Sequence, residues 1–134
     1  MIKAIIFDFY GVIDLGGLPN KPLLEIIKHD LKPRYKIGIL SNAGRDLNQL
    51  IGLEYIDLFD EIATSHQHAM VKPNPDFYKL IAQKLDVRPS DCIYVDDNQQ
   101  HCDGAKAIGM KSILYKGVEA LKPELSRILA DSNN

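Results

Sequence analysis

The stretch "AIIFDFYGVID", residues 4–14, ends an apolar run with a single carboxylate, Asp8. The run shows no alternation of polar and apolar residues, which is typical of a parallel strand that is covered on both faces. Further runs of this kind follow along the chain. The five predicted strands cover residues 3–9, 36–41, 61–65, 92–96 and 111–115.

Helical patterns alternate with these strands, because apolar side chains recur three or four places apart between them. The predicted helices cover residues 21–31, 74–85, 102–109 and 117–130. Pro22 suits a first helical turn, and residues 131–134 are expected to fray. Strands that alternate with helices predict an α/β fold with a five-stranded, mainly parallel sheet. We expect one domain over residues 1–134.

The composition argues against some classes of binding partner. The chain has 134 residues, a net charge of −2 and no long Lys/Arg block, which gives no electrostatic reason to expect nucleic acid or an anionic membrane. No apolar run approaches the roughly 20 residues that span a bilayer. Two cysteines, Cys92 and Cys102, are too few for a disulfide framework. We therefore expect a reduced, cytoplasmic protein.

Polar residues follow the predicted strands at the edge where open parallel sheets bind their ligands. Asp8 ends the first strand, and Lys72, in "MVKPNP", lies between the third strand and the next helix. The other polar residues, at the ends of the second and fourth strands, are Ser41, Asn42, Asp96 and Asp97. Any one Asp, Ser or Asn in such a place can simply cap the following helix.

Taken together, these residues have the chemical groups of a candidate active site. The adjacent carboxylates of Asp96 and Asp97 repel each other unless a cation or a donor compensates them, and a hard cation such as Mg²⁺ would do so. Asp8 is suited to act as a nucleophile, and Lys72 is suited to balance negative charge. The hydroxyl and amide that end the second strand could hold substrate oxygens.

The motifs resemble those of the haloacid dehalogenase superfamily, in order, over residues 3 to about 115. "IIFDFYGVI" is similar to the first motif, with Asp8 as the nucleophile, and "ILSNAG" to the second, with Ser41 as a donor to phosphate oxygens. "VKPNPDFY" resembles the third, with Lys72 beside nucleophile and phosphate. "IYVDDNQQHCDGAKAIGM" resembles the fourth, with Asp97 as the main metal ligand.

The resemblance implies a Rossmann-like, three-layer α/β/α fold, a covalent aspartyl intermediate on Asp8, bound Mg²⁺ and a phosphorylated substrate. On this basis we expect Asn42 and Tyr10 to contact the substrate beside Ser41. We expect Asp8, Asp96 and the backbone carbonyl of Tyr10 to lie with Asp97 around the metal.

Tyr10 departs from the phosphatases of the superfamily, which keep a second aspartate there as general acid and base. Its carbonyl can still bind a metal, but a phenol with a reference pKa near 10 is a poor acid. General acid–base help contributes about 10²–10⁴-fold to rates, so a phosphatase without it is slow. The dehalogenases that name the superfamily carry D-x-Y-G-T, close to "DFYGV", and need neither the acid nor a metal.

The acid pair in "VDD" favours a metal-dependent, phosphatase-like site over dehalogenation. Metal-free dehalogenases lack this pair, and without a cation Asp8 and Asp97 would face each other as like charges. Another acid or Asn commonly follows the main ligand by four residues in the family, and here that residue is His101.

No room exists for the helical cap that related members insert between the first two motifs. Only residues 15–35 are available, which is enough for a turn and one helix. We therefore expect a capless or cap-truncated core. Capless members act on large substrates or close the site by oligomerising, so a homo-oligomer is one expected partner.

Two other functions stay open beside the Mg²⁺-dependent phosphatase. One is a non-catalytic descendant that keeps a pocket for metal and anion, which Tyr10 and the absent cap favour. The other is haloacid dehalogenation. A two-component receiver domain is excluded, because its acid pair precedes the phosphorylated aspartate, whereas here the pair comes last.

Overall fold

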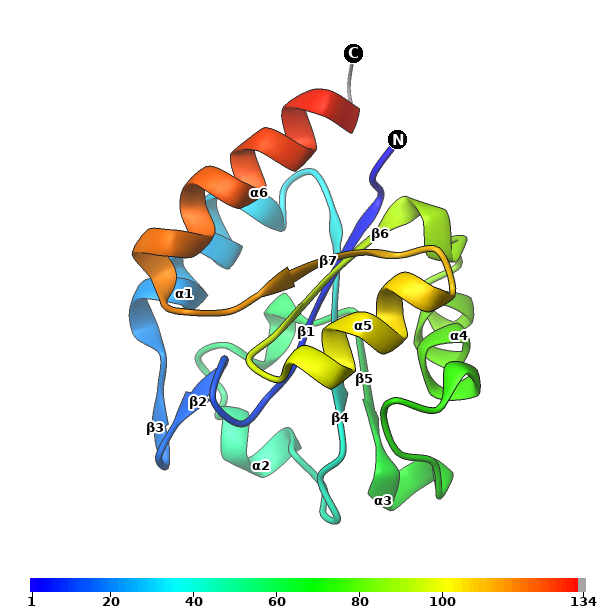
Figure 1. Cartoon of the computed structure of the whole chain (residues 1–134). Coiled ribbons are helices and arrows are strands. Elements are labelled where there is room, and N and C mark those ends of the chain that lie inside the picture. Colours follow the sequence, from blue (N-terminus) through cyan, green and yellow to red (C-terminus); the bar gives the residue numbers. More distant parts are fainter. Residues whose placement is uncertain (133–134) are drawn as a thin grey trace.

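A five-stranded parallel sheet forms the centre of the protein in a computed structural model that describes residues 1–132 (Figure 1). The strands lie in the order β5-β4-β1-β6-β7, and every neighbouring pair is parallel. Their bounds are Ala4–Phe7 for β1, Lys36–Ser41 for β4, Glu61–Thr64 for β5, Cys92–Asp96 for β6 and Lys111–Leu114 for β7. The predicted sheet is thus confirmed.

Helices cover both faces of this sheet and complete three layers. One face carries α1 (Lys21–Ile26) with its π-helical continuation (Ile27–Leu31), α2 (Asn48–Ile51) and α6 (Val118–Ser132). The other carries α4 (Pro75–Lys84) and α5 (Gln99–Ala107), and Figure 1 shows these two on the side opposite α1 and α6. The remaining short helices are Ile56–Leu58, Ser65–His68 (α3) and Pro89–Asp91.

Side chains of the central strand alternate between the two apolar layers. Ile5 and Phe7 pack in the layer below α1 and α6, whereas Ala4 and Ile6 pack in the layer below α4 and α5. Asp8 continues the ladder, because its N–H donates to the carbonyl of Val95 at 2.9 Å. The alternation therefore directs Asp8 to the face that carries α4 and α5.

The interval before β4 holds a small hairpin that the sequence did not predict. Its strands, β2 (Asp14–Leu15) and β3 (Leu18–Pro19), are antiparallel, and the turn between them is Gly16–Gly17, with φ of +64° and +93°. Helix α1 follows with Pro22 in its first turn, as expected. The interval thus holds a hairpin and one helix, and no separate cap domain.

Two helix ends differ from the prediction. Helix α5 begins at Gln99, three residues before the expected start, because Asn98 caps it by accepting from the His101 N–H at 3.1 Å. Helix α6 continues to Ser132, whose hydroxyl oxygen accepts from the Ile2 N–H at 2.7 Å. The expectation of fraying was therefore wrong for residues 131–132, and residues 133–134 lie outside the described part.

Both cysteines are free and buried, in agreement with the absence of a disulfide framework. Over residues 1–132, every helix is too short or too polar to traverse a lipid bilayer.

Candidate active site

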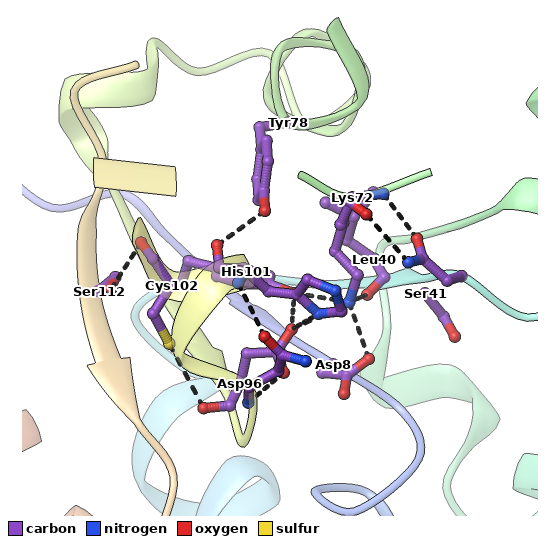
Figure 2. Close-up of polar contacts among 12 residues, drawn as sticks. Asp8, Leu40, Ser41, Lys72, Tyr78, Asp96, His101, Cys102 and Ser112 are labelled. Atoms are coloured by element: carbon purple, nitrogen blue, oxygen red, sulfur yellow. Dashed lines mark hydrogen bonds and ion pairs between the residues drawn. The ribbon is translucent and has the colours of Figure 1, made fainter. Parts of the chain in front are cut away.

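Asp8 lies at the centre of the sheet's carboxyl edge. Its strand is flanked by β4 and β6, the point where the strand order reverses and where open α/β sheets bind ligands. The residue is 8% exposed, and its Oδ1 accepts from Lys72 Nζ at 2.9 Å (Figure 2). Burial raises the pKa of Asp8 to about 6, although Lys72 counteracts that rise.

Lys72 is almost fully buried and occupies the middle of the polar cluster in Figure 2. Besides Asp8, its ammonium contacts the Leu40 carbonyl at 2.9 Å, Tyr94 Oη at 2.7 Å and Asp96 Oδ2 at 3.0 Å. Three N–H groups therefore face four oxygens. A buried ammonium is tolerated only with such compensation, so this cluster fixes the position of its charge.

Asp96 acts as the second buried partner of Lys72. Besides the lysine, the Tyr94 hydroxyl donates to its Oδ2, which also lies 3.2 Å from His101 Nδ1. Its Oδ1 accepts from the Asn98 N–H at 2.9 Å. Burial alone would raise the pKa of Asp96, but Lys72 and Tyr94 outweigh burial and hold the pKa below its usual value.

Asp97 is exposed and completes an acidic cluster at this edge. One oxygen each of Asp8, Asp96 and Asp97 lies within 4.8 Å of the other two. Partial burial and the neighbouring Asp96 raise the pKa of Asp97. Three carboxylates around a single lysine leave excess negative charge, and their oxygens are the ligands that Mg²⁺ prefers. The residues present therefore fit a divalent cation.

Gly11 makes room for the Asp97 carboxylate. Its φ is +86°, a conformation that side-chain-bearing residues rarely adopt. A Cβ atom at this position would lie 2.2 Å from Asp97 Oδ2, far inside contact distance. Thus the turn after β1 and the turn after β6 can approach each other only because residue 11 lacks a side chain.

The residues expected to hold the substrate have different surroundings. Ser41 is buried, and its Oγ accepts from the Ala43 N–H at 3.1 Å. The Asn42 side-chain amide is engaged by the Lys72 backbone. It accepts from the Lys72 N–H at 2.7 Å and donates to the Lys72 carbonyl at 3.2 Å. Tyr10 is 44% exposed, with its ring edge-on to Phe9.

Sequence reasoning missed Tyr94, which is fully buried and bridges Lys72 and Asp96. A signal for it was present, because residues two apart on a strand share one face, and Tyr94 precedes Asp96 by two. The role of Tyr78 on α4 was also missed. Its hydroxyl donates to the His101 carbonyl at 2.7 Å.

The strand order and the polar cluster at the carboxyl edge are typical of the ligand site of a Rossmann-like, doubly wound α/β fold. Residues 15–109 match the model of the family described as hydrolase, haloacid dehalogenase-like hydrolase. Because the match covers most of the chain, the protein belongs to the haloacid dehalogenase-like hydrolases.

Relatives and solved structures agree with this family. A Mycobacterium tuberculosis phosphatase is 33% identical over 104 residues, which are 73% of this chain and 46% of that protein. The chain spans less than half the length of the curated relatives it matches.

Two solved structures show the same fold. An uncharacterized protein from Corynebacterium glutamicum has a TM-score of 0.83 at 22% identity, with 93% of each chain covered. A haloacid dehalogenase family enzyme from Bacteroides thetaiotaomicron, in complex with magnesium and inorganic phosphate, has a TM-score of 0.70 at 16% identity. That alignment covers 87% of this chain and 95% of the enzyme.

Proposed function

We propose that the protein is a Mg²⁺-dependent phosphohydrolase that moves a phosphoryl group from an organic phosphate to Asp8 and then to water. The observation that carries this proposal is the buried Asp8–Lys72 pair, 2.9 Å apart, beside two further carboxylates. The phosphatase relative and the magnesium and phosphate complex of the structural neighbour support the same chemistry.

In the first step, an Asp8 oxygen bonds to phosphorus while the bond from phosphorus to the alcohol oxygen breaks. Lys72 keeps the carboxylate in place for this attack and balances its charge. The Ser41 hydroxyl is suited to donate to a phosphoryl oxygen, because its own oxygen already accepts from Ala43. The side-chain amide of Asn42 positions Lys72 through the Lys72 backbone, and Asn42, which is exposed, remains a proposed substrate contact beside Ser41.

The second step is hydrolysis of the acyl phosphate. Water bonds to phosphorus, inorganic phosphate leaves, and the Asp8 carboxylate is regenerated. The departing alcohol oxygen takes its proton from solvent in the first step, since residue 10 is a tyrosine and supplies no carboxylic acid beside it.

Mg²⁺ would be held by Asp8, Asp97 and the Tyr10 carbonyl, with Asp96 beside them and linked to Lys72. When bound, it supplies positive charge that neutralises the phosphoryl oxygens as negative charge develops.

Release of phosphate from p-nitrophenyl phosphate, with Mg²⁺ and with chelator, tests this function. We expect Mg²⁺-dependent turnover that Asp8→Asn abolishes. Asp103→Asn, an identical chemical change at an exposed site on α5, serves as the control and should keep full activity.

The remaining hypotheses give other results in the same assays. Metal-independent halide release from a 2-haloacid would overturn the proposal in favour of dehalogenation. Binding of Mg²⁺ without turnover of any phosphomonoester would identify a non-catalytic descendant.

A further inference from the structure

A cavity of about 470 Å³ lies beside the loop that carries Asp8, and no step described above uses it. Tyr10 and Gly11 line it from the loop after β1, and Arg45 and Leu50 line it from the segment after β4. The Gly16–Gly17 turn of the hairpin closes another side. Small-molecule sites commonly have volumes of roughly 300–1,000 Å³, so the cavity is large enough for an organic group.

The cavity adjoins the acidic cluster through one residue. Gly11 lines the cavity and also approaches Asp97, whose Oδ2 would lie 2.2 Å from a Cβ atom there. Tyr10 and Gly11, which follow Asp8 in the loop after β1, separate the Asp8 carboxylate from this cavity, so a substrate held against Asp8 would reach the cavity past these two residues. The alcohol part of a phosphate ester has to extend away from Asp8, because attack is in line with the bond that breaks.

Arg45 provides the wall of the cavity with a guanidinium that can bind an anion. Its guanidinium has no ion-pair or hydrogen-bond partner within residues 1–132, whereas the other charged residue of the wall, Asp14, is engaged through the Gly17 N–H at 3.0 Å. Guanidinium binds carboxylates and phosphates through two parallel hydrogen bonds. Tyr10 and Leu50, 44% and 39% exposed, add apolar surface between this charge and the loop.

We propose, on the basis of the proposed phosphohydrolase, that this cavity is the leaving-group subsite. The preferred substrates are organic phosphates whose alcohol part carries a second anionic group, and Arg45 binds that group. A carboxylate and a second phosphoryl group would both bind the Arg45 guanidinium in the same way. The test therefore includes one ester of each kind.

The test compares three esters, phenyl phosphate, 3-(carboxymethyl)phenyl phosphate and 3-(phosphonomethyl)phenyl phosphate. The methylene group keeps the acidity of the three phenols similar, so that only the distal charge differs. We expect kcat/KM to be about tenfold higher for a charged ester than for phenyl phosphate, the effect of one charge-assisted hydrogen-bond pair. The better of the two charged esters identifies the anion that the subsite takes.

Arg45→Gln should remove this preference, so that kcat/KM for the charged esters falls to about the value for phenyl phosphate measured with the same variant. Arg127→Gln, on the exposed surface of α6, is the matched control and should keep the preference. Equal kcat/KM for charged and uncharged esters in the wild type, or an unchanged preference in Arg45→Gln, would overturn the subsite.

Binding of an inert analogue separates this proposal from the phosphohydrolase itself. The probe is 3-(carboxymethyl)benzylphosphonate, measured by calorimetry with Mg²⁺ present. If no ester is hydrolysed, the proposed function fails. Binding that is about tenfold weaker in Arg45→Gln would still support an anion subsite, whereas equal binding in both proteins would overturn it.

Discussion

At the scale of single residues, Asp8 and Tyr10 lie two places apart but have opposite surroundings. Asp8 is buried against Lys72, whereas the Tyr10 side chain is 44% exposed and directed to a cavity. The loop therefore holds the proposed nucleophile against Lys72, while residue 10 supplies no carboxylic acid that could act as a general acid. This combination determines which substrates the proposed enzyme can use.

The first prediction concerns the leaving group. Tyr10→Asp should speed hydrolysis of alkyl phosphates by up to about 10²–10⁴-fold, since it restores a general acid. Esters with acidic leaving groups, such as p-nitrophenyl phosphate, need little protonation and should change much less. Steady-state kinetics on both classes measure the difference, and Tyr10→Asn, which cannot donate an acidic proton, is the control. Equal acceleration of the two classes would show that the missing acid is not the limiting defect.

Tyr94 places a hydroxyl where two buried charges meet. It lies 2.7 Å from Lys72 Nζ and donates to Asp96. Burial raises the pKa of Tyr94 well above its usual value, and therefore the group stays protonated as a donor. Without this hydroxyl, Asp96 loses one donor and Lys72 loses one of its four oxygens.

Tyr94→Phe should therefore lower the free energy of unfolding by about 1–3 kcal/mol, the cost of unsatisfied buried polar groups. It should also lower kcat/KM, because Lys72 is less firmly positioned. Tyr78→Phe is the control, since its hydroxyl is bonded to the His101 carbonyl outside the Lys72 cluster. Urea unfolding and phosphatase kinetics measure both effects. Comparable kinetic losses in the two variants would contradict a specific role of Tyr94 in positioning Lys72.

At the scale of elements, the close approach of two loops depends on Gly11. Gly11→Ala combines a strained φ of +86° with a clash against Asp97. We expect loss of Mg²⁺ binding by calorimetry, because the carboxylate is displaced. Gly52→Ala separates strain from clash, since Gly52 has a φ of +84° and nothing within 4 Å of its Cβ position. Mg²⁺ binding that is retained in Gly11→Ala, or lost equally in both variants, would contradict the steric explanation.

Asp60 links β4 to the start of β5. Its carboxylate accepts from Lys32 Nζ and from the Ile37 N–H, each at 2.8 Å. Burial raises the pKa of Asp60, but these hydrogen bonds outweigh burial and hold the pKa below 3.8. A depressed carboxyl pKa stabilises the fold above its ordinary pKa and loses this effect as the pH falls through the folded-state value.

Asp60→Asn should therefore lower the free energy of unfolding at pH 7, by less than about 1 kcal/mol because the ion pair is partly exposed and screened. The difference from wild type should persist down to about pH 5 and vanish below the folded-state pKa. Urea unfolding across this range measures it, with exposed Asp57→Asn as the control. A difference that grows in acid would contradict the assigned pKa direction.

The elements that sequence predicted are strands formed by continuous apolar runs and helices long enough to show a period. Five apolar strands and four longer helices gave clear patterns, whereas α2 and α3 have four residues each and β2 and β3 have two. Such short elements bury too little surface to require a pattern. Turns and caps determine where these short elements form, for example the Gly16–Gly17 turn between β2 and β3 and the Thr64 cap on α3.

In the candidate site, too, the residues at strand ends could be predicted from the sequence, whereas those whose roles depend on loop conformation could not. Residues at strand ends, such as Asp8 and Asp97, were found because parallel strands bring their carboxyl ends to one edge. The engagement of Asn42 by the Lys72 backbone depends on a loop conformation that no periodic pattern encodes. The same holds for Arg45, whose significance depends on the cavity that the hairpin closes.

At the scale of the whole molecule, we expect the acidic cluster to make the free energy of unfolding depend on Mg²⁺. Since only the folded chain gathers Asp8, Asp96 and Asp97, Mg²⁺ at about 100 times its Kd should add about 2.7 kcal/mol to the free energy of unfolding. Thermal unfolding with Mg²⁺ and with chelator measures the shift. Asp97→Asn should abolish the response and stabilise the metal-free protein, because it removes a repelling charge. An unchanged Tm in the wild type would contradict a metal site here.

The central position of β1 also determines when the chain can fold during synthesis. One edge of β1 pairs with β4 in the register Ala4↔Lys36, but its other edge pairs with β6 in the register Ala4↔Cys92, so that edge waits for a partner that the ribosome makes about 90 residues later. Contacts so distant in sequence slow folding, because a long loop must close before they form. An apolar strand therefore stays exposed on the nascent chain, and early shielding by a chaperone would protect this protein from aggregation.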